Sequence, residues 1–211
     1  SGGATSASTY TGKTLQLGAV ISLNGPGAVY GLQQKNGLNL AVDEINGSGG
    51  VNGAKIALDI EDDGSQQQQG AQVFQTEIQA KQVYGIIGPT LSNTAIAAHP
   101  VANSLKTPVI APSNTGNGIV GQCPYPCGFI FRDSLGEATA IPDNVKTAAG
   151  KYHPRTAVLF YANDDKFSTD GSKIFQQAFV DNGISIPSGG VLQFSKTEAS
   201  FKEYVTTALS K

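Results

Sequence analysis

The 211-residue sequence contains no methionine and no tryptophan, and it has only two cysteines and two histidines. Charged residues make up 14% of the sequence, and the formal net charge is −2. Because no basic excess is available to neutralise phosphates, the composition argues against nucleic-acid binding. Continuous apolar stretches are a handful of residues long, far short of the ~20 residues that cross a bilayer. We therefore expect no membrane-spanning segment in this sequence.

The amino terminus lacks both an initiating methionine and an apolar signal segment led by Lys or Arg. We therefore expect that processing or cloning generated it and that any export signal has been removed. The opening run Ser1–Ser8 has too little apolar surface to pack, so residues 1–13 are interpreted as a flexible tail. Two origins stay open: a disordered or vector-derived tail, or the tether of a lipid-anchored surface protein with its modified cysteine just upstream.

Both cysteines lie in the segment Cys123-Pro-Tyr-Pro-Cys127. Three intervening residues do not match the C-x-x-C spacing of thioredoxin-like redox sites. A structural zinc site would need two more ligands, and His99 and His153 are each solitary in the sequence. We predict a local disulfide between Cys123 and Cys127, which would imply an oxidising compartment.

Short apolar segments alternate with amphipathic helical segments along the first part of the chain. The predicted strands are residues 14–23, 55–60, 83–87 and 108–111, and a helix follows each of the first three. The first of these helices carries an apolar stripe of Leu38, Ala41, Val42 and Ile45. Such alternation is typical of βαβ units around a parallel sheet with helices on both faces.

Residues 117–135, rich in Gly and Pro, interrupt this alternation, which then restarts. We predict a helix over 137–150, a strand over 156–161, a loop over 162–170, a helix, a strand near 190–194 and a last helix. The predicted fold is thus α/β, with two doubly wound lobes joined by a hinge: residues 14–130 and 131–211. Since a two-stranded lobe leaves sheet edges uncovered, we expect it to be incomplete and the natural protein to continue beyond Lys211.

In a doubly wound sheet, ligands bind beyond the carboxyl ends of the strands. Four predicted turns meet there: residues 24–31, 61–65, 88–94 and 112–116. The first resembles a dinucleotide fingerprint, but Tyr30 stands where its third glycine should be. Neither histidine lies in these turns, and no G-x-S-x-G motif exists. We predict no catalytic residues, no cofactor and no metal; a Rossmann-type enzyme remains the weakest alternative.

The turns instead hold hydroxyls and carboxylates. Asp62 and Asp63 are predicted to stabilise the amino terminus of the following helix by capping it. Ser92 begins another helix, whose N–H groups favour an anion; alternatively, Ser92 or Asn93 simply caps that helix. Ser113 and Thr115 end the neighbouring strand, where an ordinary turn is the alternative. Together these hydroxyls suit a small carboxylate ligand.

Several segments together resemble the type 1 periplasmic binding proteins, in particular the branched-chain amino acid receptors of ABC importers. They are Gly25-Pro26 with Tyr30-Gly31, residues 41–46 with 49–53, Asp62-Asp63, Ile87-Gly88-Pro89 with Ser92, residues 108–113 with Thr115, and Phe131-Arg132 at the entry to the second lobe. The resemblance covers residues 14–211.

The resemblance implies an extracytoplasmic, non-enzymatic receptor, periplasmic or on the cell surface, that traps an amino acid between two lobes by hinge closure. An ABC transporter permease would be its partner, and any membrane association would come from a lipid anchor. The implied ligand-binding residues are Tyr30, Leu91, Ser92, Ser113, Asn114, Thr115 and Phe167, and the acidic residue that pairs with the ligand ammonium would lie beyond Lys211. A sensing receptor of the same fold, for an aromatic acid, an amide or another small polar molecule, is the alternative.

Overall fold

The structure is a computed structural model of the chain and describes residues 10–121 and 123–211. Of the predicted tail, residues 1–9 lie outside the described residues. The remaining residues, 10–13, form a turn in which the Tyr10 N–H donates to the Asn52 carbonyl over 3.1 Å. None of the helices in the described ranges combines the length and the hydropathy that a membrane span needs.

The chain forms two compact units, which are described separately. Unit 1 comprises residues up to Asn114 together with Ile119–Asp133, and unit 2 comprises Thr115–Gly118 together with Ser134–Lys211. The chain therefore passes between the units three times, whereas the sequence suggested a single boundary after residue 130.

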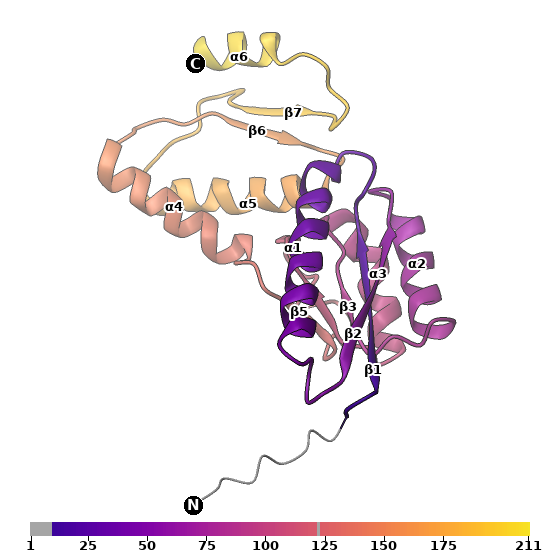
Figure 1. Cartoon of the computed structure of the whole chain (residues 1–211). Coiled ribbons are helices and arrows are strands. Elements are labelled where there is room, and N and C mark those ends of the chain that lie inside the picture. Colours follow the sequence, from indigo (N-terminus) through magenta and orange to yellow (C-terminus); the bar gives the residue numbers. More distant parts are fainter. Residues whose placement is uncertain (1–9, 122) are drawn as a thin grey trace, which may run out of the picture. The chain divides into compact units, whose positions relative to one another are not determined.

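Unit 1 is built on a parallel five-stranded sheet with the strand order β2-β1-β3-β4-β5. In chain order its elements are β1 (Thr14–Ile21), α1 (Ala28–Gly47), β2 (Lys55–Asp62), α2 (Gln67–Gln79), β3 (Ile86–Ile87), α3 (Ser92–Ser104), β4 (Val109–Ala111) and β5 (Ile130–Arg132). Helix α1 lies on one side of this sheet, and α2 and α3 lie on the other (Figure 1). The predicted alternation of parallel strands and helices is confirmed.

The apolar core of unit 1 lies between the sheet and the α2–α3 layer. Its buried residues are Val20, Phe74, Val83, Ile86, Ala98, Ala102, Val109 and Ile130. In contrast, the only residue of α1 that is buried is Gly31. In the stripe predicted for α1, Ala41 and Ile45 are exposed and Leu38 and Val42 are half-buried. The 3.6-residue pattern thus predicted the helix but not the way it packs.

Strand β5 was not predicted as part of the first sheet. Ile130 pairs in parallel with Val109, and Phe131 pairs with Ile110. The connection from β4 to β5 carries no helix in its described residues, so the βαβ pattern could not reveal it. The same connection holds the disulfide between Cys123 and Cys127, as the sequence predicts.

Unit 2 has a two-stranded parallel sheet of β6 (Leu159–Ala162) and β7 (Val191–Phe194). Helices α4 (Glu137–Tyr152) and α5 (Lys166–Asp181) pack on one of its faces and α6 (Lys202–Leu209) on the other (Figure 1). Helix α5 starts inside the predicted loop, because the Asp165 carboxylate caps it by accepting from the Ser168 N–H over 2.9 Å. On the other face, Phe194 contacts Phe201 and Tyr204 at centroid distances of 4.9 and 6.1 Å.

A testable prediction concerns Gly31, where α1 meets the end of β1. A β-carbon built on Gly31 would lie 1.8 Å from the backbone oxygen of Ser22, so Gly31→Ala must push the helix off the sheet. We expect a loss of about 1–3 kcal/mol in unfolding free energy, measured by urea denaturation. Gly37→Ala in the same helix is the control: nothing lies within 4 Å of its β-carbon, so it should stabilise by about 0.5–1 kcal/mol. Equal effects of the two substitutions would contradict the contact.

A second prediction concerns His99, which is fully buried in α3 with its Nδ1 2.9 Å from the Ile119 carbonyl oxygen. Burial lowers the pKa of His99 below its usual 6.5. Below about pH 6.5 the unfolded chain therefore binds a proton that the folded chain does not, so this contribution to stability is lost as the pH falls. We expect His99→Gln to flatten the decline in unfolding free energy between about pH 7 and 5. Urea titrations with parallel pH profiles for both proteins would refute this role.

Candidate functional site

The loops that follow β1 to β4 meet at the carboxyl edge of the unit 1 sheet, as the sequence predicts. The Ser22 N–H, just after β1, donates to Thr90 Oγ1 after β3 over 2.9 Å. The Gly27 N–H donates to Ser65 Oγ over 3.0 Å, which joins the loops after β1 and β2. Ser113, after β4, donates its hydroxyl to the Thr90 carbonyl over 2.7 Å. Residues far apart in the sequence are thus fixed at one edge.

Asp62 joins the first two of these loops. Its carboxylate accepts from the N–H groups of Leu23 and Gly64, at 2.7 and 2.8 Å, and from Asn24 Nδ2 at 2.8 Å. Partial burial opposes ionisation, but these donors lower the pKa of Asp62 below its usual value. The expectation that Asp62 serves the amino terminus of α2 is wrong: the N-cap position is Gln66, and no side chain caps this helix.

Asp63 is fully buried and has other partners than Asp62. Its Oδ1 accepts from the Ser22 hydroxyl at 2.7 Å and from the Ser65 N–H at 2.8 Å. Burial raises the pKa of Asp63, against the hydrogen bonds from Ser22 and Ser65. Like Asp62, Asp63 holds loops together and does not cap α2.

Gln34 of α1 connects two further loops. Thr90 Oγ1 donates to Gln34 Oε1, and Gln34 Nε2 donates to Ser113 Oγ, both over 2.7 Å. Because Ser113 gives its only hydroxyl proton to the Thr90 carbonyl, its remaining capacity is to accept hydrogen bonds. Sequence reasoning missed Gln34 and Thr90. Gln34 lies one helical turn after Tyr30, and this spacing is the one signal in the sequence that could have identified it.

Helix α3 begins at this edge. Its N-cap residue is Leu91, and no side chain caps the helix; neither Ser92 nor Asn93 therefore occupies the N-cap position. Ser92 is the first helical residue and is 4% exposed. The N–H groups of a first helical turn carry a partial positive charge, which favours an anion.

The other predicted ligand-binding residues of unit 1 differ in their surroundings. Tyr30 lies in the first turn of α1 and is 59% exposed. Asn114 is buried, and its Nδ2 donates to the Pro89 carbonyl over 2.8 Å. The Asn114 amide nitrogen therefore supports the loop that leads to α3.

Two predicted ligand-binding residues belong to unit 2. The Thr115 carbonyl accepts from the N–H of Glu137 over 3.1 Å, at the start of α4. Phe167 lies in the first turn of α5 and is exposed. The structure thus groups Tyr30, Leu91, Ser92, Ser113 and Asn114 in one unit and Thr115 with Phe167 in the other.

Within residues 10–121 and 123–211, one group of three acidic side chains could hold a metal ion: Asp59, Glu61 and Glu77. Lys81 already supplies a cation there, since its Nζ lies 2.6, 2.6 and 2.7 Å from the three carboxylates. These carboxylates raise the pKa of Lys81. We therefore interpret this cluster as an internal ion-pair network.

A family model described as periplasmic binding protein matches residues 14–211. Among curated proteins, the Leu/Ile/Val-binding protein BraC3 of Rhizobium johnstonii is 34% identical over 101 residues, which cover 48% of this chain and 27% of that protein.

Solved structures share the fold, among them the following two. LivJ from Streptococcus pneumoniae, a branched-chain amino acid transporter substrate-binding protein in complex with isoleucine, has a TM-score of 0.81 and 24% identity over 94% of this chain. A solute-binding protein of an ABC transporter from Rhodopseudomonas palustris, in complex with 4-hydroxybenzoate, has a TM-score of 0.79 and 20% identity over 94%. The chain spans 55% and 51% of these two structures. At these identities the two structures show the fold alone, and they confirm the predicted α/β class.

The hydrogen bonds of Thr90 generate a third prediction. Thr90→Val keeps the shape but leaves the Ser22 N–H and Gln34 Oε1 without this partner. We expect a loss of about 1–3 kcal/mol in unfolding free energy in urea denaturation. Thr76→Val is the matched control, because Thr76 is exposed and its hydroxyl donates only to the Gln72 carbonyl of its own helix; its effect should stay within about 0.5 kcal/mol. A neutral Thr90→Val would mean that Thr90 does not hold the edge together.

Proposed function

Because the chain belongs to the periplasmic binding protein family, we propose that it captures a small carboxylate ligand, an amino acid, at the carboxyl edge of unit 1. The observation that carries this proposal is the start of α3, where a helix amino terminus without a side-chain cap meets a fixed array of neutral polar groups. The ligand would then pass to the permease of an ABC transporter.

The ligand carboxylate is assigned to the first turn of α3. Backbone N–H groups and the helix dipole favour a negative charge at that position, and the Ser92 hydroxyl adds a donor. The loops around the site contain no Lys or Arg in residues 22–31, 61–65, 88–94 and 112–116. The donors assigned to the carboxylate at the start of α3 are thus neutral, which suits capture followed by release.

The direction of the hydrogen bonds around Ser113 supports an amino group on the ligand. Since the Ser113 hydroxyl donates to the Thr90 carbonyl and accepts from Gln34 Nε2, it has no proton left for a carboxylate. Its oxygen can accept a hydrogen bond from an ammonium group. This favours an amino acid over a simple carboxylate, in line with the Leu/Ile/Val-binding relative and the isoleucine-bound structure.

A second candidate ligand class is aromatic acids. The neighbour of known structure that holds 4-hydroxybenzoate motivates it, and a phenolic hydroxyl can also donate to Ser113. For either ligand the location would be extracytoplasmic, as for periplasmic relatives, and the Cys123–Cys127 disulfide agrees with an oxidising compartment. A sensing role with a protein partner is the alternative to transport.

Ser92→Ala tests the carboxylate site. Removing one hydrogen bond to a charged group should weaken binding by about 1.5–3 kcal/mol, measured by calorimetry with leucine, isoleucine, valine and 4-hydroxybenzoate. Ser104→Ala is the control: Ser104 ends the same helix, is exposed and bonds only to the Val101 carbonyl, so its substitution should leave affinity unchanged.

The outcomes separate the proposals. Saturable binding of a branched-chain amino acid that Ser92→Ala weakens supports the amino-acid ligand. Binding of 4-hydroxybenzoate alone, equally sensitive to Ser92, transfers the assignment to aromatic acids. Affinity that is identical in Ser92→Ala and the wild type removes α3 from the site.

A further inference from the structure

A second hollow in unit 1 lies at the amino edge of the sheet, at the opposite end of the strands from the proposed amino-acid site. It has a volume of about 630 Å³, within the range typical of small-molecule pockets. Its lining comes from the turn before β1, the start of β1, the turn before β2 and the segment before β3: Tyr10, Lys13, Thr14, Leu15, Val51, Asn52, Ala54 and Tyr84.

The walls of this pocket are held by the backbone. The Tyr10 N–H donates to the Asn52 carbonyl over 3.1 Å, and the Tyr84 N–H donates to the Gln16 carbonyl of β1 over 2.9 Å. Val51 and Ala54 exchange two backbone hydrogen bonds of 2.8 and 3.0 Å, which close the turn that carries Asn52. Three separate chain segments are therefore fixed around the cavity, so a ligand would not have to order them.

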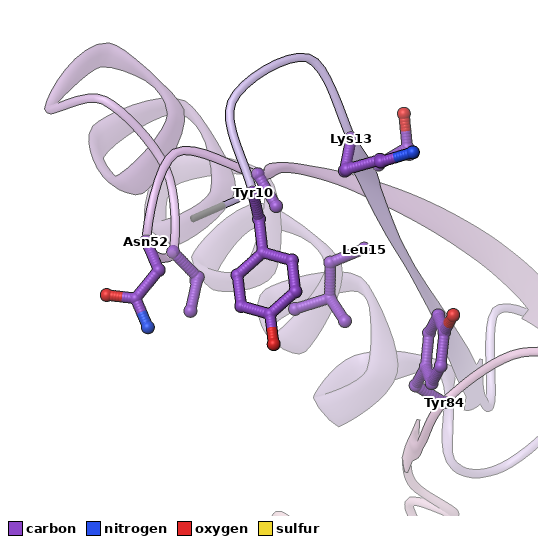
Figure 2. Close-up of a pocket in the computed structure, with 8 residues that line it drawn as sticks. Tyr10, Lys13, Leu15, Asn52 and Tyr84 are labelled. Carbon is purple, nitrogen blue, oxygen red and sulfur yellow. The ribbon is translucent and has the colours of Figure 1, made fainter. Parts of the chain in front are cut away.

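Two aromatic rings flank an apolar floor. Figure 2 shows the Tyr10 ring on one side of Leu15 and Tyr84 beyond Leu15 on the other side, while the Asn52 carboxamide lies past Tyr10. Tyr10 and Tyr84 are 52% and 67% exposed, whereas Leu15 is half-buried. Exposed tyrosine rings offer flat contact area, and their hydroxyls offer hydrogen bonds at the rim.

The charge of the lining is one-sided. Lys13 is the only basic residue in the lining, and the lining contains no Asp or Glu. This favours an anion over a cation. We propose that the pocket binds a planar aromatic molecule that carries a negative charge, with its ring over Leu15 between Tyr10 and Tyr84 and its charge toward Lys13.

This site shares no residue with the site at the carboxyl edge, and its proposal does not depend on the proposed function. The probe is 2-naphthoate, whose fluorescence anisotropy reports binding. We expect saturable binding by the wild-type protein, and Tyr84→Ala should weaken it about tenfold, since an aromatic contact and its buried area are lost. Tyr152→Ala is the matched control, a tyrosine of unit 2 that is 69% exposed, and it should bind like the wild type.

Charge is tested separately. A 2-naphthylmethylammonium cation should bind at least several-fold more weakly than 2-naphthoate, and Lys13→Gln should reduce that preference, while Lys106→Gln, at an exposed lysine outside the pocket, should not. Circular dichroism verifies that each variant is folded. The proposal is overturned if 2-naphthoate shows no saturation below about 1 mM, if Tyr84→Ala and Tyr152→Ala behave alike, or if Ser92→Ala and not Tyr84→Ala abolishes binding. The last result would place the probe at the carboxyl edge.

Discussion

The carboxyl edge of unit 1 depends on the hydrogen bonds that Thr90 makes. The Thr90 hydroxyl accepts from the Ser22 N–H after β1 and donates to Gln34 of α1, while the carbonyl of the same residue accepts from Ser113 after β4. Parallel strands end side by side, but nothing in the sheet fixes the loops that follow them. One buried residue that bonds to three elements supplies this constraint. Asp63 extends it to β2 through Ser22, so four loops behave as one rigid group.

The position of α1 follows from the same place in the fold. This helix buries Gly31 and little else, so an apolar stripe cannot fix its position on the sheet. Two other contacts fix it: Gly31 fits against the backbone of Ser22, and Gln34 is bonded to Thr90 and Ser113. Since Tyr30 precedes Gly31, the contact between Gly31 and the Ser22 backbone also fixes the position of the exposed Tyr30 residue. The packing of α1 and the geometry of the candidate site therefore depend on the same contacts at this edge.

The sequence predicted the elements better than their connections. The periodicity of apolar residues and the turn residues located β1, α2, α3 and α4, because both signals are local in the sequence. The loop-to-loop hydrogen bonds could not be predicted, because Ser22, Asp63 and Thr90 are 41 and 27 residues apart and their partners depend on the finished fold. For the same reason the two aspartates were assigned to the nearest helix, although their carboxylates bond to the loop after β1 and to the turn that they themselves begin. Strand β5 was not predicted as part of this sheet, because a connection without a helix gives no periodic signal in the sequence.

The hydrogen-bonded loops at this edge also bear on the strength of the proposed binding. Each hydrogen bond to a charged group contributes about 1.5–3 kcal/mol, so three of them give about 5–9 kcal/mol. Micromolar affinity corresponds to about 8 kcal/mol. Ordering a flexible polar side chain costs about 0.5–1.5 kcal/mol, a cost that grows with every group that must be immobilised. Because Gln34, Thr90 and Ser113 already hold one another in place, these side chains are ordered when the chain folds, and ordering them does not reduce the free energy of binding. With the site already ordered, three such hydrogen bonds approach the free energy of micromolar binding before the ligand's lost translational freedom is counted, and a ligand held this way can still leave.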